Sequence, residues 1–167
     1  MRNIALCGFM GSGKTYVSKL LAEALDCPVL DTDALIVEAA GKSIPQIFAE
    51  DGEAAFRDLE SDAVKKAAGG KGKVISLGGG ALLRADSAEA VRSNCLLIFI
   101  DTPFEVCYSR ISSDPDRPIA AAKSKEQLSR LFDYRRGICL SHAHAVQDGS
   151  ASGEDIVSAI LSTSGRD

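Results

Sequence analysis

The feature that most constrains this chain is the stretch Gly8 to Thr15, which reads Gly-Phe-Met-Gly-Ser-Gly-Lys-Thr. It matches the pattern G-x-x-x-x-G-K-[ST] and lies between a short apolar run and a segment whose leucines have helical spacing. Glycines allow successive backbone N–H groups to turn toward phosphate oxygens, and the positive end of the following helix adds to the attraction. A Gly-rich turn that only joins a strand to a helix would require neither lysine nor threonine. The stretch therefore predicts an ATP site in which Lys14 contacts the β- and γ-phosphates and Thr15 binds Mg²⁺.

Apolar strand-like runs and helical patterns alternate along all 167 residues. We expect strands at residues 3–7, 28–30, 74–77, 96–100 and, with a weaker pattern, 143–146. Helices are expected at residues 17–25, 43–50, 52–68, 87–91, 125–137 and 154–161, with two more beginning at a Thr32 or Asp33 cap and at a Thr102 cap, the latter running to Ile111. Because each parallel crossover needs a connection long enough for a helix, this alternation predicts an α/β fold with a parallel sheet covered on both faces. The length fits a single domain over residues 1–167.

The composition argues against several classes of protein. A net charge of -4, a pI near 5.2 and the lack of tryptophan argue against nucleic-acid binding, which needs clustered cations. The longest apolar run, residues 95–100, is far shorter than the roughly 20 residues of a membrane-spanning helix. No secretory pattern follows Met1, so we expect a soluble, cytoplasmic protein. Its five scattered cysteines are expected to be free thiols, and His142 and His144, which lack a third ligand, are interpreted as ordinary polar residues.

Three further segments follow predicted strands or lie on a helix near them, and each also has a purely structural interpretation. Asp31 and Asp33 follow the second strand, where one carboxylate can hold Mg²⁺ through water while the other takes the proton of an attacking hydroxyl, although Asp also caps helices. Gly78-Gly79-Gly80 exposes backbone N–H groups to a small polar ligand, or simply forms a tight turn. Arg57 lies on a helix, where a solvated position is an equally good interpretation.

In order and spacing, these motifs together resemble those of shikimate kinases. The matching residues are Gly8 to Thr15, Asp31-Thr32-Asp33, Gly52-Glu53 with Phe56-Arg57 and Glu60, Gly78-Gly79-Gly80, and Arg117-Pro118. The resemblance, over about residues 3–146, implies a three-layer α/β/α fold of the nucleoside-monophosphate-kinase type with a five-stranded parallel sheet. It also implies a substrate-binding segment at about residues 33–60 and a lid at about residues 111–124. The implied activity is phosphorylation of a shikimate hydroxyl by ATP with Mg²⁺, giving shikimate 3-phosphate in the route to chorismate and aromatic amino acids. We expect the enzyme to act as a monomer.

The resemblance further implies roles for individual residues. ATP would contact the phosphate-binding loop and two arginines: Gly11, Ser12, Gly13, Lys14, Thr15, Tyr16, Arg110 (near adenine) and Arg117. Shikimate would contact Asp33, Arg57, Gly78, Gly79, Gly80 and Arg135. Mg²⁺ would be held by Thr15 and, through water, by Asp31. In catalysis, Asp33 would be the base, Lys14 and Arg117 would stabilise the transferring charge, and Arg57 with Arg135 would pair with the substrate carboxylate.

Departures from the family pattern and rival functions leave choices open. Where the family shows Arg-x-Pro-Leu-Tyr, this chain has Arg135-Arg136-Gly137-Ile138-Cys139, so Arg136 and Arg130 are alternatives to Arg135. Residues 147–153 contain neither the arginine nor the proline that the family often offers to adenine, so we expect backbone contacts there. The rival enzymes are gluconate and nucleoside-monophosphate kinases of the same fold. The rival from another class is a nucleotide-dependent switch, although the Asn-Lys-x-Asp sequence of guanine-binding switches is absent.

Overall fold

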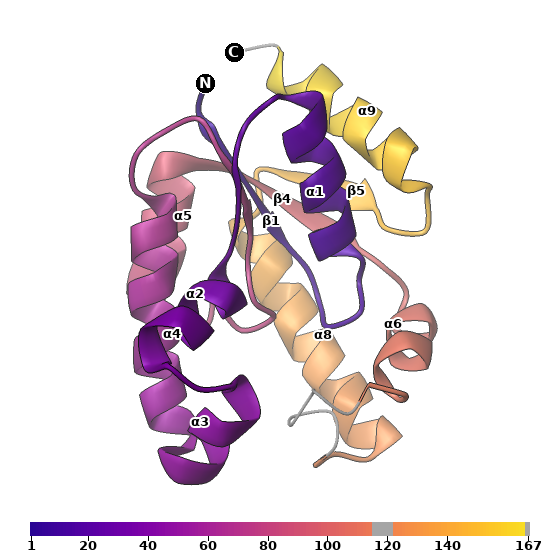
Figure 1. The fold of residues 1–167 in the computed structure, drawn as a ribbon. Helices are drawn as coiled ribbons and strands as arrows, with labels where there is room; N and C mark the ends of the chain where they lie inside the picture. Colours follow the sequence, from indigo (N-terminus) through magenta and orange to yellow (C-terminus); the bar gives the residue numbers. More distant parts are fainter. Residues whose placement is uncertain (115–121, 166–167) are drawn as a thin grey trace.

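The computed structural model describes residues 1–114 and 122–165. Its centre is a five-stranded sheet in the order β2-β3-β1-β4-β5, in which all neighbouring strands are parallel (Figure 1). The strands are β1 (Asn3–Cys7), β2 (Val29–Asp31), β3 (Val74–Ser76), β4 (Cys95–Asp101) and β5 (Ala145–Asp148). The predicted parallel sheet is confirmed, and its last strand begins at Ala145 rather than at residue 143.

Helices cover both faces of the sheet. They are α1 (Lys14–Ala24), α2 (Thr32–Ala40), α3 (Ile44–Glu50), α4 (Gly52–Ala68), α5 (Ala85–Asn94), α6 (Phe104–Ile111), α8 (Lys125–His142) and α9 (Gly153–Ser164). Helices α1 and α9 lie together on one face, and α4 lies beside α5 on the other (Figure 1). The predicted three-layer α/β/α architecture is therefore confirmed. Each helix within the described ranges is too short or too polar to cross a lipid bilayer.

The strand side chains divide between two cores because successive residues of a strand point to opposite faces. On β1, Ile4 and Leu6 pack against α1 and α9, whereas Ala5 and Cys7 face α4, α5 and α8. The central position of β1, with β3 and β4 on either side, leaves every one of its residues buried. The loop that follows β1 therefore starts from a fully buried central strand, at the carboxyl edge where ligands of such folds bind.

Two predicted helix caps are wrong, and in both cases the threonine bonds to another loop instead. Asp31, not Thr32 or Asp33, caps α2, and the Thr32 hydroxyl accepts a hydrogen bond of 2.8 Å from the N–H of Gly78. Pro103 precedes α6, and the Thr102 hydroxyl donates a hydrogen bond of 2.8 Å to the carbonyl of Ser12. Threonine often caps helices, so sequence propensity favoured these two residues. In the folded protein, backbone groups of neighbouring loops bond to their hydroxyls instead.

Helix α8 extends to His142 rather than ending at Gly137. A glycine inside a helix costs about 1 kcal/mol relative to alanine. The buried residues Leu128, Phe132, Arg135 and Cys139 recur every three or four positions, so the packed face of the helix continues beyond the glycine. Packing on the sheet therefore outweighs the local preference to stop.

Candidate active site

The Gly8 to Thr15 loop has the geometry of a phosphate cradle. Gly11 and Gly13 adopt positive φ angles of 74° and 91°, which favour glycine. A side chain at Gly11 would also collide with helix α6, because its Cβ would lie 2.9 Å from the carbonyl of Cys107. Helix α1 begins at Lys14, so its first N–H groups face the loop.

A cleft of about 390 Å³ opens at this loop, and its volume suits a nucleotide. The lining includes all of the predicted ATP residues except Arg117, which lies outside the described residues: Gly11, Ser12, Gly13, Lys14, Thr15, Tyr16 and Arg110. Arg110 also donates a hydrogen bond of 2.8 Å to the carbonyl of Gly11, which ties α6 to the loop. Lys19 lines the cleft as well and was missed in the sequence, because a lysine on the exposed face of a helix is ordinarily solvated.

The two predicted Mg²⁺ residues flank a buried hydroxyl. Thr15 Oγ1 lies 3.5 Å from Ser76 Oγ, and Ser76 is paired with Asp31 on the neighbouring strand β2. Carboxylate and hydroxyl oxygens are hard donors of the kind that Mg²⁺ prefers. The Oδ1 atom of Asp31 accepts hydrogen bonds from the N–H groups of Asp33 (2.8 Å) and Ala34 (3.3 Å), so this carboxylate also has the capping role.

The oxygen donors of Thr15 and Asp31 suit Mg²⁺ better than a metal that is coordinated entirely by protein side chains. In residues 1–114 and 122–165, no three His, Cys, Asp or Glu side chains form a metal-holding group. Mg²⁺ ordinarily takes one or two carboxylates and completes its shell with water and substrate phosphates. His144 has a structural role instead, since its Nδ1 accepts a hydrogen bond of 3.0 Å from the N–H of Leu97.

The glycine run after β3 packs tightly against three predicted acceptor residues. A Cβ on Gly78 would lie 2.6 Å from Asp33 Oδ1, and one on Gly79 would lie 3.3 Å from Arg135 Nη1. One on Gly80 would overlap the guanidinium of Arg57, whose Cζ would be 3.0 Å away. The run is thus more than a tight turn, because only glycine lets these three side chains approach the backbone so closely.

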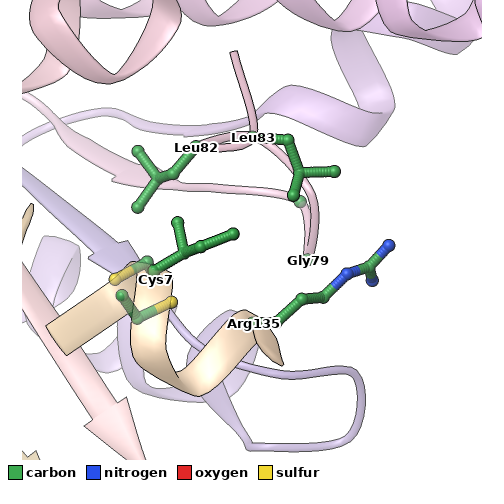
Figure 2. A pocket seen from close by; sticks show the side chains of 8 residues that line it. Cys7, Gly79, Leu82, Leu83 and Arg135 are labelled. Atoms are coloured by element: carbon green, nitrogen blue, oxygen red, sulfur yellow. The ribbon is translucent and has the colours of Figure 1, made fainter. Parts of the chain in front are cut away.

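Arg135 is the arginine of α8 that faces this site. Its side chain extends from α8 past Gly79 (Figure 2), and the residue is only 6% exposed. Its Nε is one of the few buried side-chain nitrogens or oxygens without a hydrogen-bond partner among the described residues. Burial lowers the pKa of Arg135, and the positive charge of Arg57 lowers it further. A desolvated cation of this kind is stabilised by an incoming anion.

The two alternative arginines are engaged elsewhere. Arg136 makes a two-pronged ion pair with Asp101, with Nε–Oδ1 and Nη2–Oδ2 distances of 3.0 Å and 2.8 Å. Arg130 is exposed and pairs with Glu126 one turn earlier on α8. Residues 128, 132, 135 and 139 form the buried face of α8, so the helix turns these neighbours away from the glycine run.

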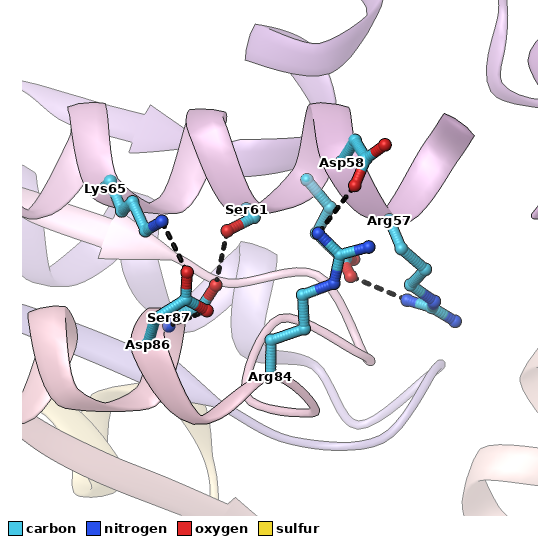
Figure 3. Close-up of polar contacts among 8 residues, drawn as sticks. Arg57, Asp58, Ser61, Lys65, Arg84, Asp86 and Ser87 are labelled. Atoms are coloured by element: carbon cyan, nitrogen blue, oxygen red, sulfur yellow. Dashed lines mark hydrogen bonds and ion pairs between the residues drawn. The ribbon is translucent and has the colours of Figure 1, made fainter. Parts of the chain in front are cut away.

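Arg57 is not a solvated residue, because its side chain is 11% exposed and bonds to a buried carboxylate. Its Nη1 donates to Oε1 of Glu60 at 2.6 Å (Figure 3), and Glu60 is 4% exposed. Burial raises the pKa of Glu60, and the charge of Arg57 opposes this shift. Sequence reasoning did not assign Glu60 a place in the site. Its spacing of three from Arg57 on a helix was the available signal.

Helix α4, which carries Arg57 and Glu60, is fastened to the segment that follows the glycine run. Arg84 pairs with Asp58 at 2.7 Å, Lys65 pairs with Asp86 at 2.6 Å, and Ser87 donates to Ser61 at 3.0 Å (Figure 3). The two ion pairs are exposed and individually weak. Together with the buried hydroxyl pair they hold α4 in register with Gly78 to Gly80.

The ATP cleft and the acceptor site adjoin one another. Met10, within the phosphate loop, lies near Gly79, since a Cβ there would be 3.7 Å from Met10 Cγ. Phe9 and Met10 pack with apolar residues of α6 and α8, so the loop is fixed on the side that faces Arg135. The phosphate loop and the glycine run beside Asp33 therefore lie next to one another.

Comparisons with known proteins identify the family of this chain. The shikimate kinase family model matches residues 10–164. A shikimate kinase of Persephonella marina is 38% identical over 161 residues, which are 96% of this chain and 98% of that protein. A shikimate kinase of Symbiobacterium thermophilum is 47% identical over 163 residues, or 95% and 94% of the two chains.

The similarity extends to solved structures. Shikimate kinase from Acinetobacter baumannii, determined in complex with shikimate, has a TM-score of 0.94 and 30% identity, covering 99% of this chain and 95% of that one. A gluconokinase from Sinorhizobium meliloti shares the fold at a TM-score of 0.63 and 18% identity. With the family model spanning nearly all of the sequence, the chain belongs to the shikimate kinase family.

Proposed function

We propose that this protein transfers the γ-phosphoryl group of ATP to a hydroxyl of shikimate, giving shikimate 3-phosphate. The observation that carries the proposal is the pair of largely buried guanidiniums, Arg57 and Arg135, beside the carboxylate of Asp33 along one glycine run. That combination suits a compact ligand with an anionic end and a hydroxylated end. The adjoining phosphate loop supplies the donor.

The charges of the acceptor site favour a carboxylate. Arg57 pairs with Glu60, whereas Arg135 has no ion-pair partner in the part of the chain that the structure describes and lies near the positive charge of Arg57. A substrate carboxylate between the two guanidiniums would relieve this repulsion and supply hydrogen bonds in the planar geometry that guanidinium prefers. The ring would then lie over Gly79 and Gly80, where no side chain intervenes.

The hydroxyl to be phosphorylated would face Asp33, which would orient it and accept its proton. Lys14 and the loop N–H groups would stabilise charge on the transferring phosphoryl group. When bound, Mg²⁺ would neutralise phosphate charge, and Thr15 with Asp31 would hold it. The roles of Arg117 and of a lid at about residues 111–124 remain predictions of the family resemblance. We further propose that the enzyme works in the cytoplasm as a monomer.

A coupled assay of ADP release tests this function. Shikimate, gluconate and nucleoside monophosphates are offered as acceptors, and ATP and GTP as donors. We expect rapid turnover with ATP and shikimate only. Asp33→Asn and Lys14→Ala should each lose most of that activity, while Arg130→Gln, on the exposed face of α8, should keep it. Preference for another acceptor, or normal turnover by Asp33→Asn, would refute the proposal.

A further inference from the structure

Two cysteines from distant parts of the sequence meet under the acceptor site. Cys7 ends β1 and Cys139 lies on α8, and both thiols are buried, at 2% and 6% exposure. They line one small cavity of about 10 Å³, together with Gly78, Gly79 and Arg135 (Figure 2). Both cysteines also belong to the same buried core. All five cysteines of the chain are free.

The surroundings make the two thiols unequal. The neighbouring Cys139 thiol and burial both raise the pKa of Cys7. The neighbouring Cys7 thiol lowers the pKa of Cys139 against the opposing effect of burial, and the positive charges of Lys14 and Arg135 lower it further. Because Arg135 lies one turn before Cys139 on the same buried face of α8, its positive charge favours the nucleophilic thiolate at Cys139, and Cys7 is positioned as its partner.

The cavity connects this thiol pair to the acceptor site. Its lining includes the backbone of Gly78 and Gly79 and the side chain of Arg135, all of which belong to the acceptor site described above. A volume near 10 Å³ holds about one water molecule. Because the cavity borders this glycine run, we expect shikimate bound on the run to slow the access of a small oxidant to the sulfurs.

We propose that Cys7 and Cys139 form a reversible redox site, in which hydrogen peroxide joins them as a disulfide and thereby disables the acceptor site. The Cys139 thiolate attacks one peroxide oxygen, the O–O bond breaks, and hydroxide leaves as a sulfenic acid forms. The Cys7 sulfur then attacks the sulfenic sulfur, forming the S–S bond and releasing a second hydroxide. The two thiol protons convert the hydroxides to water, so two thiols and one peroxide give one disulfide and two waters. A dithiol reductant reverses the change and is itself oxidised to a disulfide.

Bond formation would disturb Arg135 because it draws α8 toward the sheet. The sulfurs of two free thiols lie well beyond the ~2.05 Å of a covalent S–S bond. Cys7 is fixed in the central strand, so the movement falls on α8, where Arg135 lies one turn before Cys139. Misplacement of a positioning group by about 1 Å can cost about 100-fold in rate. This consequence for activity rests on the proposed function, whereas formation of the disulfide does not.

The first arm of the test follows the covalent bond alone. Reduced full-length protein is treated with hydrogen peroxide, alkylated under denaturing conditions, and analysed by intact mass and peptide mapping. We expect loss of two hydrogens and a Cys7–Cys139 linked peptide, with slower formation when shikimate is present. Cys139→Ser should form no such link, while Cys95→Ser, which removes another buried thiol, should form it at the wild-type rate.

The second arm follows activity. Oxidised wild type should lose at least about tenfold in kcat/KM for shikimate, with a smaller change for ATP, and a dithiol should restore it. Cys139→Ser should start with normal activity and resist peroxide. The proposal is overturned if both thiols remain alkylatable, if other cysteines pair, or if Cys139→Ser is inactivated as fast as wild type. If the reduced protein lacked activity toward shikimate, the proposed function would be wrong. Mass analysis and peptide mapping would still show whether Cys7 and Cys139 form a disulfide.

Discussion

Replacement of Arg135 by methionine should weaken shikimate binding and yet stabilise the free protein. Arg135 is buried next to a like charge, and its Nε lacks a hydrogen-bond partner among the described residues. In the complex we expect its guanidinium to pair with the substrate carboxylate. Truncating one partner of a buried, hydrogen-bonded charge pair costs about 2–5 kcal/mol. This corresponds to a loss on the order of 30-fold to several thousand-fold in kcat/KM for shikimate.

The free protein should respond in the opposite direction. Replacing buried charges by apolar side chains of similar volume is often stabilising by about 1–4 kcal/mol. For a chain of this size each kcal/mol raises the midpoint of thermal unfolding by roughly 2–4 °C, so we expect a rise of about 2–16 °C. Glu60 retains its partner Arg57 in this variant and is not left unpaired.

The assay combines steady-state kinetics with thermal unfolding, with and without shikimate. Arg136→Met is the matched control, because it removes the neighbouring arginine, whose side chain is 43% exposed and pairs with Asp101. An exposed ion pair contributes about 0–1 kcal/mol, so this control should change neither measurement much. Arg135→Met with an unchanged shikimate KM, or with an unfolding midpoint several degrees below wild type, would show that Arg135 is a structural residue and refute the reasoning.

Three further predictions follow from contacts around the site. Gly80→Ala places a methyl group against the Arg57 guanidinium, so the shikimate KM should rise about tenfold while the ATP KM stays near wild type; equal changes in both would contradict this. Thr102→Val removes the hydrogen bond to the Ser12 carbonyl, and the loss of about 1 kcal/mol should raise the ATP KM about fivefold. Thr102→Ser keeps the hydroxyl and should keep the wild-type KM; equal KM values for the two variants would contradict this prediction. Burial and the charges of Arg2 and Arg92 lower the pKa of His144 below 6.5, so the unfolded chain binds its proton more tightly than the folded protein. The free energy of unfolding should therefore fall as the pH drops below about 6.5. Denaturant titrations should show a smaller fall with pH for His144→Gln than for the wild type. The same pH dependence in both proteins would show that His144 does not contribute to it.

The parts of the fold that the sequence predicted are those set by local chemistry. The phosphate loop needs glycine, lysine and threonine at fixed positions, and its positive φ angles at Gly11 and Gly13 follow from that requirement. Alternating apolar runs and helical patterns were enough to predict the parallel sheet, because each crossover must contain a helix. The helix expected at residues 43–50 is also found as α3, and Ser43 caps it by forming a capping box with Gln46.

The parts that could not be predicted depend on contacts between distant segments. Glu60 looks like an ordinary helical ion-pair residue, and only the packing of α4 against residues 78–87 buries it. The threonines at positions 32 and 102 were expected to cap helices, but their partners Gly78 and Ser12 belong to other loops. Cys7 and Cys139 line the same cavity only because α8 packs against the assembled sheet, and the sequence does not show this packing.

The sequence left the choice among the arginines of α8 open, although it contains the information needed to make that choice. Neighbouring residues on a helix point about 100° apart, so the rotation of α8 decides which arginine faces the acceptor site. The apolar spacing of Leu128, Phe132 and Cys139 contains this information, because Arg135 falls on the same face. A helical-wheel argument from the sequence could have selected it over Arg130 and Arg136.

The central claim is that one acid binds across Arg57 and Arg135 with its hydroxyl toward Asp33, next to the phosphate loop. A crystal structure with ADP, Mg²⁺ and shikimate tests it most directly. We expect the shikimate carboxylate between the two guanidiniums and a ring hydroxyl within hydrogen-bond distance of Asp33. Shikimate bound away from Gly79, or with its carboxylate toward Asp33, would contradict the account.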